Sequence, residues 1–161
     1  MYCSSADTYS PLAADWIVSV TGDDRPIREP LASMVGDPRH VVQRDRADFL
    51  WVHLVDIPAA LEARRYRVAD RIVIDVAAGS GTPECVRVAL DGGPDGATCT
   101  TTDEAADLTL TRSDLGAAYL GSTPLWPAAA GRRVDAHRPG AVEAFDRMFG
   151  EDRQAWCHTW F

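Results

Sequence analysis

The stretch from Arg71 to Thr111, RIVIDVAAGSGTPECVRVALDGGPDGATCTTTDEAADLTLT, decides the fold class of this chain. Four short runs rich in Val, Ile, Leu and Thr are separated by segments that contain turn-forming Gly, Pro and Asp. The pattern predicts strands over 71–76, 85–90, 97–102 and 107–111, with turns at 79–83 and 91–96. Two hairpins followed by a returning strand indicate an antiparallel or mixed sheet.

The residues on either side of this stretch extend the pattern. Residues 49–55 alternate as a strand would, with Phe49, Trp51, His53 and Val55 on one face. Asp56 is placed to cap a helix that has Pro58 in its first turn and ends near Tyr66. After the sheet, three helices are expected, over 114–120 with Ser113 as N-cap, 124–130, and 140–149 after Pro139. The order of one strand, one helix, four strands and three helices predicts an α+β fold.

Residues 1–47 differ from the remainder of the chain. They contain one short apolar stretch, at 16–20, and then a segment rich in Pro, Asp and Arg. Pro26, Pro30 and Pro38 prevent a long helix there, so only a turn or two is expected around 30–35. We interpret residues 1–47 as an arm and residues 48–161 as the domain on which it packs.

Composition excludes several classes of protein. The chain has 161 residues and a net charge of −8, and all 16 of its basic residues are arginine. An acidic chain without a basic run is poorly suited to nucleic acid or to an anionic membrane surface. No apolar run reaches the roughly 18 residues of a membrane span. The composition is typical of a GC-rich bacterial genome, and the N-terminus lacks the regions of a secretory signal, so we expect a cytoplasmic protein.

Cysteine and histidine spacing predicts no metal site. Cys3, Cys85, Cys99 and Cys157 are widely scattered, with no C-x-x-C pair among them. The four histidines are equally dispersed. Reduced thiols and no bound metal are therefore expected.

Four ordered motifs resemble one family. Residues 50–66, LWVHLVDIPAALEARRY, are similar to L-W-V-R-L-V-D-V-P-A-A-L-A-A-R-x-Y of the enhanced intracellular survival (Eis) group of GNAT acetyltransferases. Residues 37–39 resemble the D-P-R that precedes that stretch, and residues 114–121 resemble D-L-G-x-x-Y-L-G. Trp156, Cys157 and Phe161 resemble the W-C-x-x-x-F ending of the family.

The resemblance implies a fold and a chemistry. It implies a sterol-carrier-protein-like mixed sheet covered by helices over residues 48–161, after an arm that ends a middle GNAT-like domain. The family acetylates amines of aminoglycosides, lysine side chains and related polycations with acetyl-CoA, and takes the carboxylate of its last residue as general base. Here that group is the α-carboxylate of Phe161. The acetyl-CoA-binding GNAT domain and its pyrophosphate loop have no counterpart in the sequence, so acetyl-CoA is expected only through a separate GNAT polypeptide. The family also implies a homo-oligomer.

Other candidate site residues have structural alternatives. His53 and Asp56 could form a general-base pair, or serve as a strand histidine and a helix cap. Cys157 and His158 could supply a thiolate nucleophile, but neighbours in an extended tail point apart. Large aromatic residues could line an apolar cavity or simply pack the core; these are Trp51, Tyr66, Tyr119, Trp126, Trp156 and Trp160.

Three functions follow from these features. The chain could be the C-terminal part of an Eis-like N-acetyltransferase, acting with a GNAT partner through Phe161 and a substrate surface. It could instead be a separate module that binds an apolar small molecule in the aromatic cavity. It could also be an enzyme of specialised metabolism that has reused that cavity.

Overall fold

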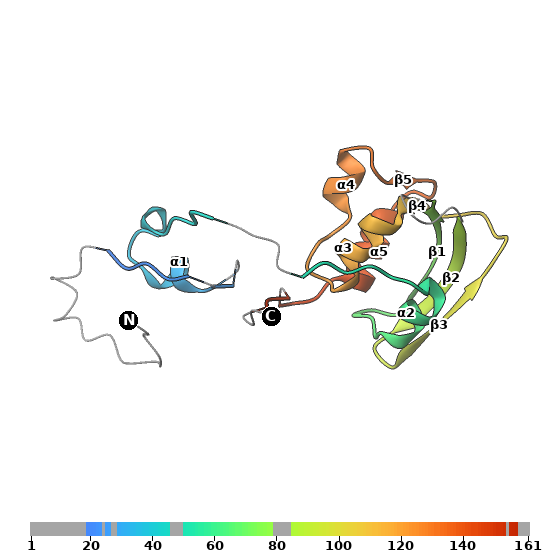
Figure 1. The fold of residues 1–161 in the computed structure, drawn as a ribbon, viewed down its shortest axis with the longest axis horizontal. Helices are drawn as coiled ribbons and strands as arrows, with labels where there is room; N and C mark the ends of the chain where they lie inside the picture. The colour runs from blue at the N-terminus through green and yellow to red at the C-terminus, as the bar shows by residue number, and fades with distance from the viewer. Residues whose placement is uncertain are drawn as a thin grey trace.

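A computed structural model describes residues 19–23, 25–26, 29–45, 50–78, 85–153 and 155–157. Its helices and strands are drawn in Figure 1. In chain order they are α1 (Leu31–Met34), the 3-10 turn η2 (Pro38–His40), α2 (Ile57–Ala63), β1 (Asp70–Ala77), β2 (Val86–Gly93), β3 (Gly96–Thr101), β4 (Leu108–Thr111), α3 (Arg112–Tyr119), α4 (Trp126–Ala130), β5 (Asp135–Ala136) and α5 (Ala141–Phe149).

The five strands form one mixed sheet in the order β3-β2-β1-β4-β5. Hairpin neighbours pair antiparallel, with Ile74 opposite Val88 and Leu90 opposite Cys99. Only β1 and β4 are parallel, with Ile74 opposite Leu108. The four predicted strands from 71 onward are therefore confirmed, and so is the expectation of an antiparallel or mixed sheet.

One face of the sheet carries the helices and the core. Residues of alternate positions, such as Ile72 and Ile74, are fully buried against Leu61, Leu115 and Phe145 of the helices. The intervening positions are more polar and more exposed. Figure 1 shows α2, α3 and α5 on the same side of the strands. The result is a two-layer α+β body in which period-two alternation separates core from solvent.

The connection from β3 to β4 passes over the face without helices. Residues 102–107 must cross β2 and β1, because β4 lies on the far side of β1. Glu104 accepts hydrogen bonds from Arg71 at 2.6 Å and, through its carbonyl, from Arg87 at 3.2 Å. Asp107 then lies beside β1. Its backbone N–H donates to Val73 O, and its carboxylate accepts from Val73 N, both at 2.8 Å.

The prediction of a strand over 49–55 is wrong for its described part. Residues 50–54 are extended, but they lie along α3 and pair with no strand. Arg112 of α3 donates to the carbonyls of Leu54 and Val55 at 2.5 and 3.1 Å. The alternation arises because one side of the segment faces α3 and the other faces solvent, which produces the same period as an edge strand.

The structure also differs from the prediction in one helix cap, one turn and one short strand. α3 is capped by Thr111, whose hydroxyl accepts from Asp114 N at 3.1 Å, and not by Ser113, two residues later. Gly92 and Gly93 belong to β2, so the predicted turn over 91–96 is shortened to Pro94 and Asp95. β5, which lies between α4 and α5, is too short to show a pattern in the sequence. The turn predicted at 79–83 and residue Phe49 lie outside the described residues.

The arm contributes no buried residue among those described. α1 forms within the predicted span, and Asp37 caps η2 by accepting from Arg39 N at 3.0 Å. Val20, Met34 and Val42 remain 70–72% exposed. Figure 1 shows this segment standing apart from the sheet and its helices. The boundary at residues 47 and 48 stays a prediction.

Gly116 of α3 provides a test of how the extended segment is seated. A Cβ at this position would lie 2.3 Å from the carbonyl oxygen of Val52. We expect Gly116→Ala to push residues 50–55 away from α3 and to lower the free energy of unfolding by about 1–3 kcal/mol. Chemical denaturation measures this change. Gly131→Ala is the matched control, because a Cβ there would lie an ordinary 3.4 Å from Pro127 O. An equal loss in both variants would contradict the proposed contact.

Candidate functional site

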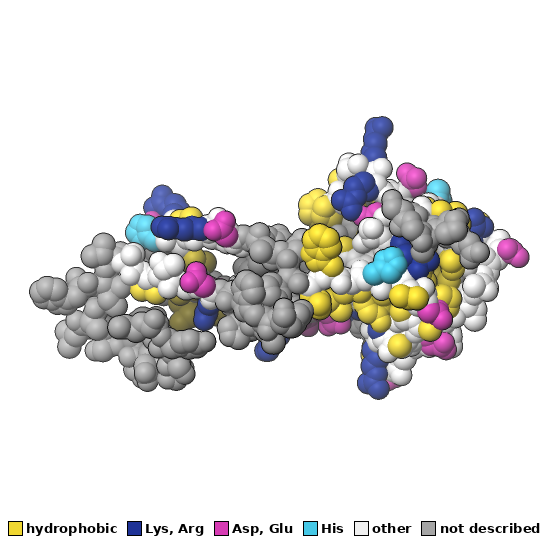
Figure 2. Space-filling model, in the orientation of Figure 1, with side chains coloured by type: hydrophobic (Ala, Val, Ile, Leu, Met, Phe, Trp, Pro, Cys, Tyr) yellow, Lys and Arg dark blue, Asp and Glu magenta, His cyan; other side chains and the backbone are white. Residues whose placement is uncertain are grey.

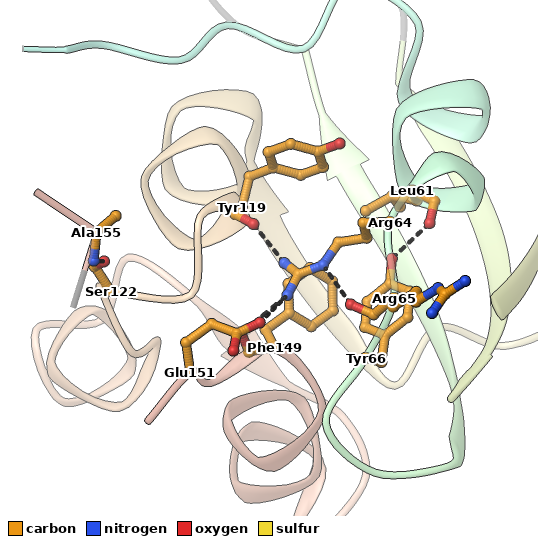
Figure 3. Close-up of polar contacts among 9 residues, drawn as sticks. All are labelled: Leu61, Arg64, Arg65, Tyr66, Tyr119, Ser122, Phe149, Glu151 and Ala155. Atoms are coloured by element: carbon orange, nitrogen blue, oxygen red, sulfur yellow. Dashed lines mark hydrogen bonds and ion pairs between the residues drawn. The ribbon is translucent and has the colours of Figure 1, made fainter. Parts of the chain in front are cut away.

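The described polar contacts converge on Arg64, the residue that ends α2. Its side chain is only 11% exposed. The guanidinium donates to the carbonyl of Tyr119, to that of Phe149 at 3.1 Å and to that of Arg65 at 3.2 Å. Figure 3 shows the guanidinium between the end of α3 and the end of α5. A single cation therefore binds the carbonyls of two helix ends, where helix dipoles concentrate negative charge.

Three aromatic rings enclose the same guanidinium. Its central carbon lies 4.7 Å from the ring centres of Tyr66 and Phe149 and 5.6 Å from that of Tyr119. Burial lowers the pKa of Arg64, although Tyr66, Glu151 and Tyr119 oppose that shift. Burial likewise raises the pKa of Tyr66, whose hydroxyl donates to Leu61 O at 2.7 Å. Arginine stays protonated through such shifts, so the cluster holds a permanent buried cation.

The start of the C-terminal tail is fastened beside this cation. Glu151 lies 3.8 Å from the Arg64 guanidinium and donates its backbone N–H to Gly121 O at 3.3 Å. Farther along, Ala155 N donates to the Ser122 hydroxyl at 2.5 Å (Figure 3). Gly121 has φ +77°, and a Cβ there would lie 2.7 Å from Phe149 O. The tail thus leaves α5 along a path that only glycine at position 121 permits.

Residues of two resemblance motifs meet in this cluster, and the tail that leads to a third motif starts beside it. Arg64 and Tyr66 come from the 50–66 motif, and Tyr119 and Gly121 come from the 114–121 motif. The tail that follows Glu151 leads to the third, which starts at Trp156. Tyr119 also donates its hydroxyl to Ala60 O at 2.9 Å, joining the first two motifs again. The spacing of these motifs therefore reflects one anchoring site for the tail.

The structure shows no hydrogen bond between the members of the predicted His53–Asp56 pair. Asp56 caps α2 by accepting from Ala59 N at 3.0 Å, as the cap prediction required. His53 is exposed, and among the described residues it makes no hydrogen bond to Asp56. The described geometry therefore favours the structural interpretation of these two residues.

The large aromatic residues have different surroundings. Tyr66 is buried in the core, and Tyr119 is half-buried beside Arg64. Trp51, Trp126 and Trp156 are 84%, 61% and 50% exposed. Trp160, Phe161 and His158 lie outside the described residues. The described aromatic residues therefore do not surround a common cavity.

Two open depressions lie on the body, both with polar groups in their walls. One, of about 420 Å³, is lined by Trp126, His137, Arg138 and the start of α5. The other, of about 480 Å³, is lined by Asp75, Arg87, Thr102 and Asp103. Within the described part of the chain, no three His, Cys, Asp or Glu side chains gather as a metal-binding group. No described helix is long and apolar enough to cross a bilayer.

Sequence reasoning missed Arg64 and the buried carboxylate of Asp114. Asp114 is 3% exposed and accepts hydrogen bonds from the Thr111 hydroxyl at 2.6 Å and from Arg133. Arg64 and Arg65 are adjacent and chemically identical, so nothing in the sequence marks which of them is buried. One feature of the sequence could have pointed to Arg64: it directly follows a helix that carries apolar residues at helical spacing.

Comparison with known proteins gives this arrangement a family. The sterol carrier protein domain model matches residues 57–158, and the chain belongs to that family. An uncharacterized N-acetyltransferase of Streptomyces griseus is 33% identical over 143 residues, which are 89% of this chain and 34% of that protein. N-acetyltransferase Eis of Mycobacterium tuberculosis is 34% identical over 128 residues, 78% of this chain and 30% of that protein.

The solved structures agree with the sequence matches. The crystal structure of Eis1 from Mycobacterium abscessus superposes with a TM-score of 0.72 at 32% identity, over 85% of this chain and 34% of that one. The chain is homologous to the C-terminal region of Eis-family N-acetyltransferases. It spans about a third of the length of these relatives and covers their sterol-carrier-like part, not their acetyl-CoA-binding GNAT domain. The expected family and the sterol-carrier-like fold are confirmed.

The role of Arg64 can be tested by substitution. Arg64→Met keeps much of the side-chain volume but leaves the carbonyls of Tyr119 and Phe149 without a buried donor. We expect the free energy of unfolding to fall by about 3 kcal/mol, and a protease to cut after residue 150 more quickly. Arg65→Met is the matched control, because Arg65 is exposed and binds Arg64 only through its backbone. Equal stability of the two variants would show that the cluster does not hold the tail.

Burial also predicts the reactivity of two thiols. Burial raises the pKa of Cys99 to about 11, while Cys85 is exposed. Because thiolate is the reactive form, Cys99 should stay unlabelled by an aromatic disulfide reagent at pH 8 until the body unfolds. Counting labelled thiols by mass spectrometry tests this: Cys85→Ser should remove one rapidly reacting thiol, and Cys99→Ser should remove none. Rapid labelling of Cys99 would contradict the burial of its side chain on β3.

Proposed function

We propose that this chain acts as the C-terminal part of an Eis-like N-acetyltransferase. In this role it supplies a terminal carboxylate, on Phe161, and part of a substrate surface to a GNAT partner. The homology to the C-terminal region of such enzymes is the observation that carries the proposal. The substrates of the proposed reaction are polycationic amines of the aminoglycoside or polyamine type.

The anchored tail supports a role for its end. Arg64, Gly121 and Ser122 hold the first residues after α5 at the end of α3, through the contacts to Phe149, Glu151 and Ala155. Most chain termini are free unless such contacts hold them. A tail held at Glu151 and Ala155 restricts the region that Phe161 can reach, which is what delivery of a reactive group to a partner requires.

The described residues do not fit acetyl-CoA. The N-terminus of α3, where a diphosphate could bind, already holds the Asp114 carboxylate and the Thr111 cap. The larger depression places Asp75 and Asp103 beside Arg87, so two carboxylates would face an anionic cofactor. Acetyl-CoA is therefore assigned to the GNAT partner, where it would supply an activated acetyl thioester.

A terminal carboxylate suits the proposed substrates. It attracts an ammonium group, and it can accept a proton as the amine becomes a nucleophile. The ordinary pKa of such a carboxylate is about 3.3–3.7, so it is ionised at neutral pH. The net charge of −8 adds a field that favours approach of polycations.

A carrier of apolar small molecules is the weaker alternative. The described core is filled by its own side chains, and both depressions are open to solvent and have polar groups in their walls. An apolar ligand would need an enclosed apolar cavity, since pockets of that kind bury most of a ligand's surface. The described residues thus favour the acetyltransferase role over the carrier role.

A chimeric enzyme tests the proposal. The homologous C-terminal third of Mycobacterium tuberculosis Eis would be replaced by this chain, and acetyl transfer to an aminoglycoside would be followed with acetyl-CoA. We expect activity in the chimera and a fall in kcat/KM of at least about 100-fold when Phe161 is deleted, because the deletion moves the terminal carboxylate one residue back, to Trp160, and away from its proposed position as general base. A folded chimera without acetyl transfer would overturn the proposed function.

Phe161→Ala is the matched control for the deletion. It removes the ring but leaves a terminal carboxylate at the same position in the chain. Activity should stay within a few-fold of the unsubstituted chimera. If deletion of Phe161 leaves kcat/KM unchanged, a carboxylate at the position of residue 161 is not needed for the reaction; if Phe161→Ala is as damaging as the deletion, the ring is what matters.

A further inference from the structure

Exposed apolar side chains gather at the C-terminal end of α3. The extended segment 50–55 runs antiparallel to α3, with Leu54 O bonded to Arg112 and Val52 O against Gly116. Two residues of an extended chain advance about as far as four residues of a helix. Continuing this register by one more step places Leu50 beside Leu120. Leu50 is 54% exposed and Leu120 is 40% exposed.

The tail adds a second tryptophan to this group. Ala155 is bonded to Ser122, two residues beyond Leu120, and this places Trp156 beside the same helix end. Trp51, next to Leu50, is 84% exposed, and Trp156 is 50% exposed. We call Leu50, Trp51, Leu120 and Trp156 the α3-end patch. Figure 2 shows hydrophobic surface on the viewed face of the body, where the extended segment of Figure 1 approaches from the arm. Clustered exposure of this kind marks an interaction surface.

The described part of the arm, residues 19–23, 25–26 and 29–45, is not packed into the core. It enters the body at Leu50, inside the α3-end patch. None of its described residues is buried, and α1 has only four residues, too few to be stable alone. Nevertheless, the match to the Streptomyces griseus relative extends over 143 residues, more than the chain contains after residue 57. That relative therefore matches part of the arm, and this chain covers 34% of its length.

We infer that the α3-end patch is the docking surface for the GNAT partner, and that the arm leads into the same interface. This inference rests on the proposed function and names the residues that hold the partner. The partner fits for two reasons. The patch surrounds the point at which the chain arrives from the arm, and the anchored tail leaves from the same helix end. A partner docked there would meet both the arm and the tail.

Photo-crosslinking tests the surface in the chimeric enzyme. A p-benzoylphenylalanine is introduced at position 51, or at position 126 as the control, because Trp126 is also an exposed tryptophan but lies on α4. After irradiation, mass spectrometry identifies the attached residue. Crosslinks from position 51 to the acetyltransferase part, with none from position 126, are expected. Mixing isotope-labelled and unlabelled chimera distinguishes contacts within one chain from contacts between copies.

Trp51→Asp gives a second readout. We expect it to separate the unfolding of the body from that of the acetyltransferase part, so that one calorimetric transition becomes two. Trp126→Asp, and Val55→Asp at the equally exposed other end of the segment, should leave one transition. Circular dichroism of the isolated chain checks that Trp51→Asp leaves the body folded.

Each outcome decides a separate question. Crosslinks to a second copy of this chain would assign the patch to a homo-oligomer and overturn the inference. The absence of any crosslink from position 51 in an active chimera would also overturn it, while leaving the proposed function intact. A folded but inactive chimera would overturn the proposed function, and the inference with it.

Discussion

The buried guanidinium of Arg64 is the interaction on which the arrangement of helices and tail depends. Without it, two helix ends would present unpaired carbonyls, those of Tyr119 and Phe149, to the same small volume. Backbone carbonyls in such a position are costly to leave unbonded, and the repulsion between two negative dipole ends adds to that cost. The rings of Tyr66, Phe149 and Tyr119 allow the cation to be buried without a fully buried carboxylate partner. The ends of α2, α3 and α5 are therefore fixed by one side chain.

The same arrangement links the sheet to the tail. Tyr66 follows Arg64 in the chain, packs against Phe149 and lies close to the position a Cβ of Gly92 would take on β2. Its hydroxyl returns to Leu61 at the end of α2. The sheet thus supports Tyr66, Tyr66 supports Arg64, and Arg64 holds the exit of the tail from α5. Packing and anchoring of the tail therefore account for the residues that the 50–66 and 114–121 motifs contribute to this cluster. The proposed chemical group, the carboxylate of Phe161, lies beyond the described residues.

Patterns of neighbouring residues correctly predicted strands β1 to β4 and the α2 cap, which short-range interactions determine. Strands β1 to β4 were visible because runs rich in β-branched residues, such as Ile72 to Ile74, lie between turn-forming segments. The α2 cap was visible because Asp56 precedes Pro58 at the right spacing. The segment at 50–55 was misassigned because an extended chain on a helix buries one side as a strand in a sheet does. Thr111 and Ser113 are both good caps, and only tertiary contacts, including those of Asp114 with Arg133, select the first. Arg64 could not be distinguished from Arg65, because its environment comes from residues 55 and 85 positions away.

The seating of residues 50–55 on α3 has a consequence for the order of folding. This segment has no strand to join, and its contacts lie about 60 residues later in the chain. It can be fixed only after α3 has formed and packed on the parallel pair of β1 and β4, which is itself a non-local contact. During synthesis, residues that precede Leu50 are therefore not held against the body until most of the chain has left the ribosome. Any domain joined there would have time to fold independently before the two are brought together.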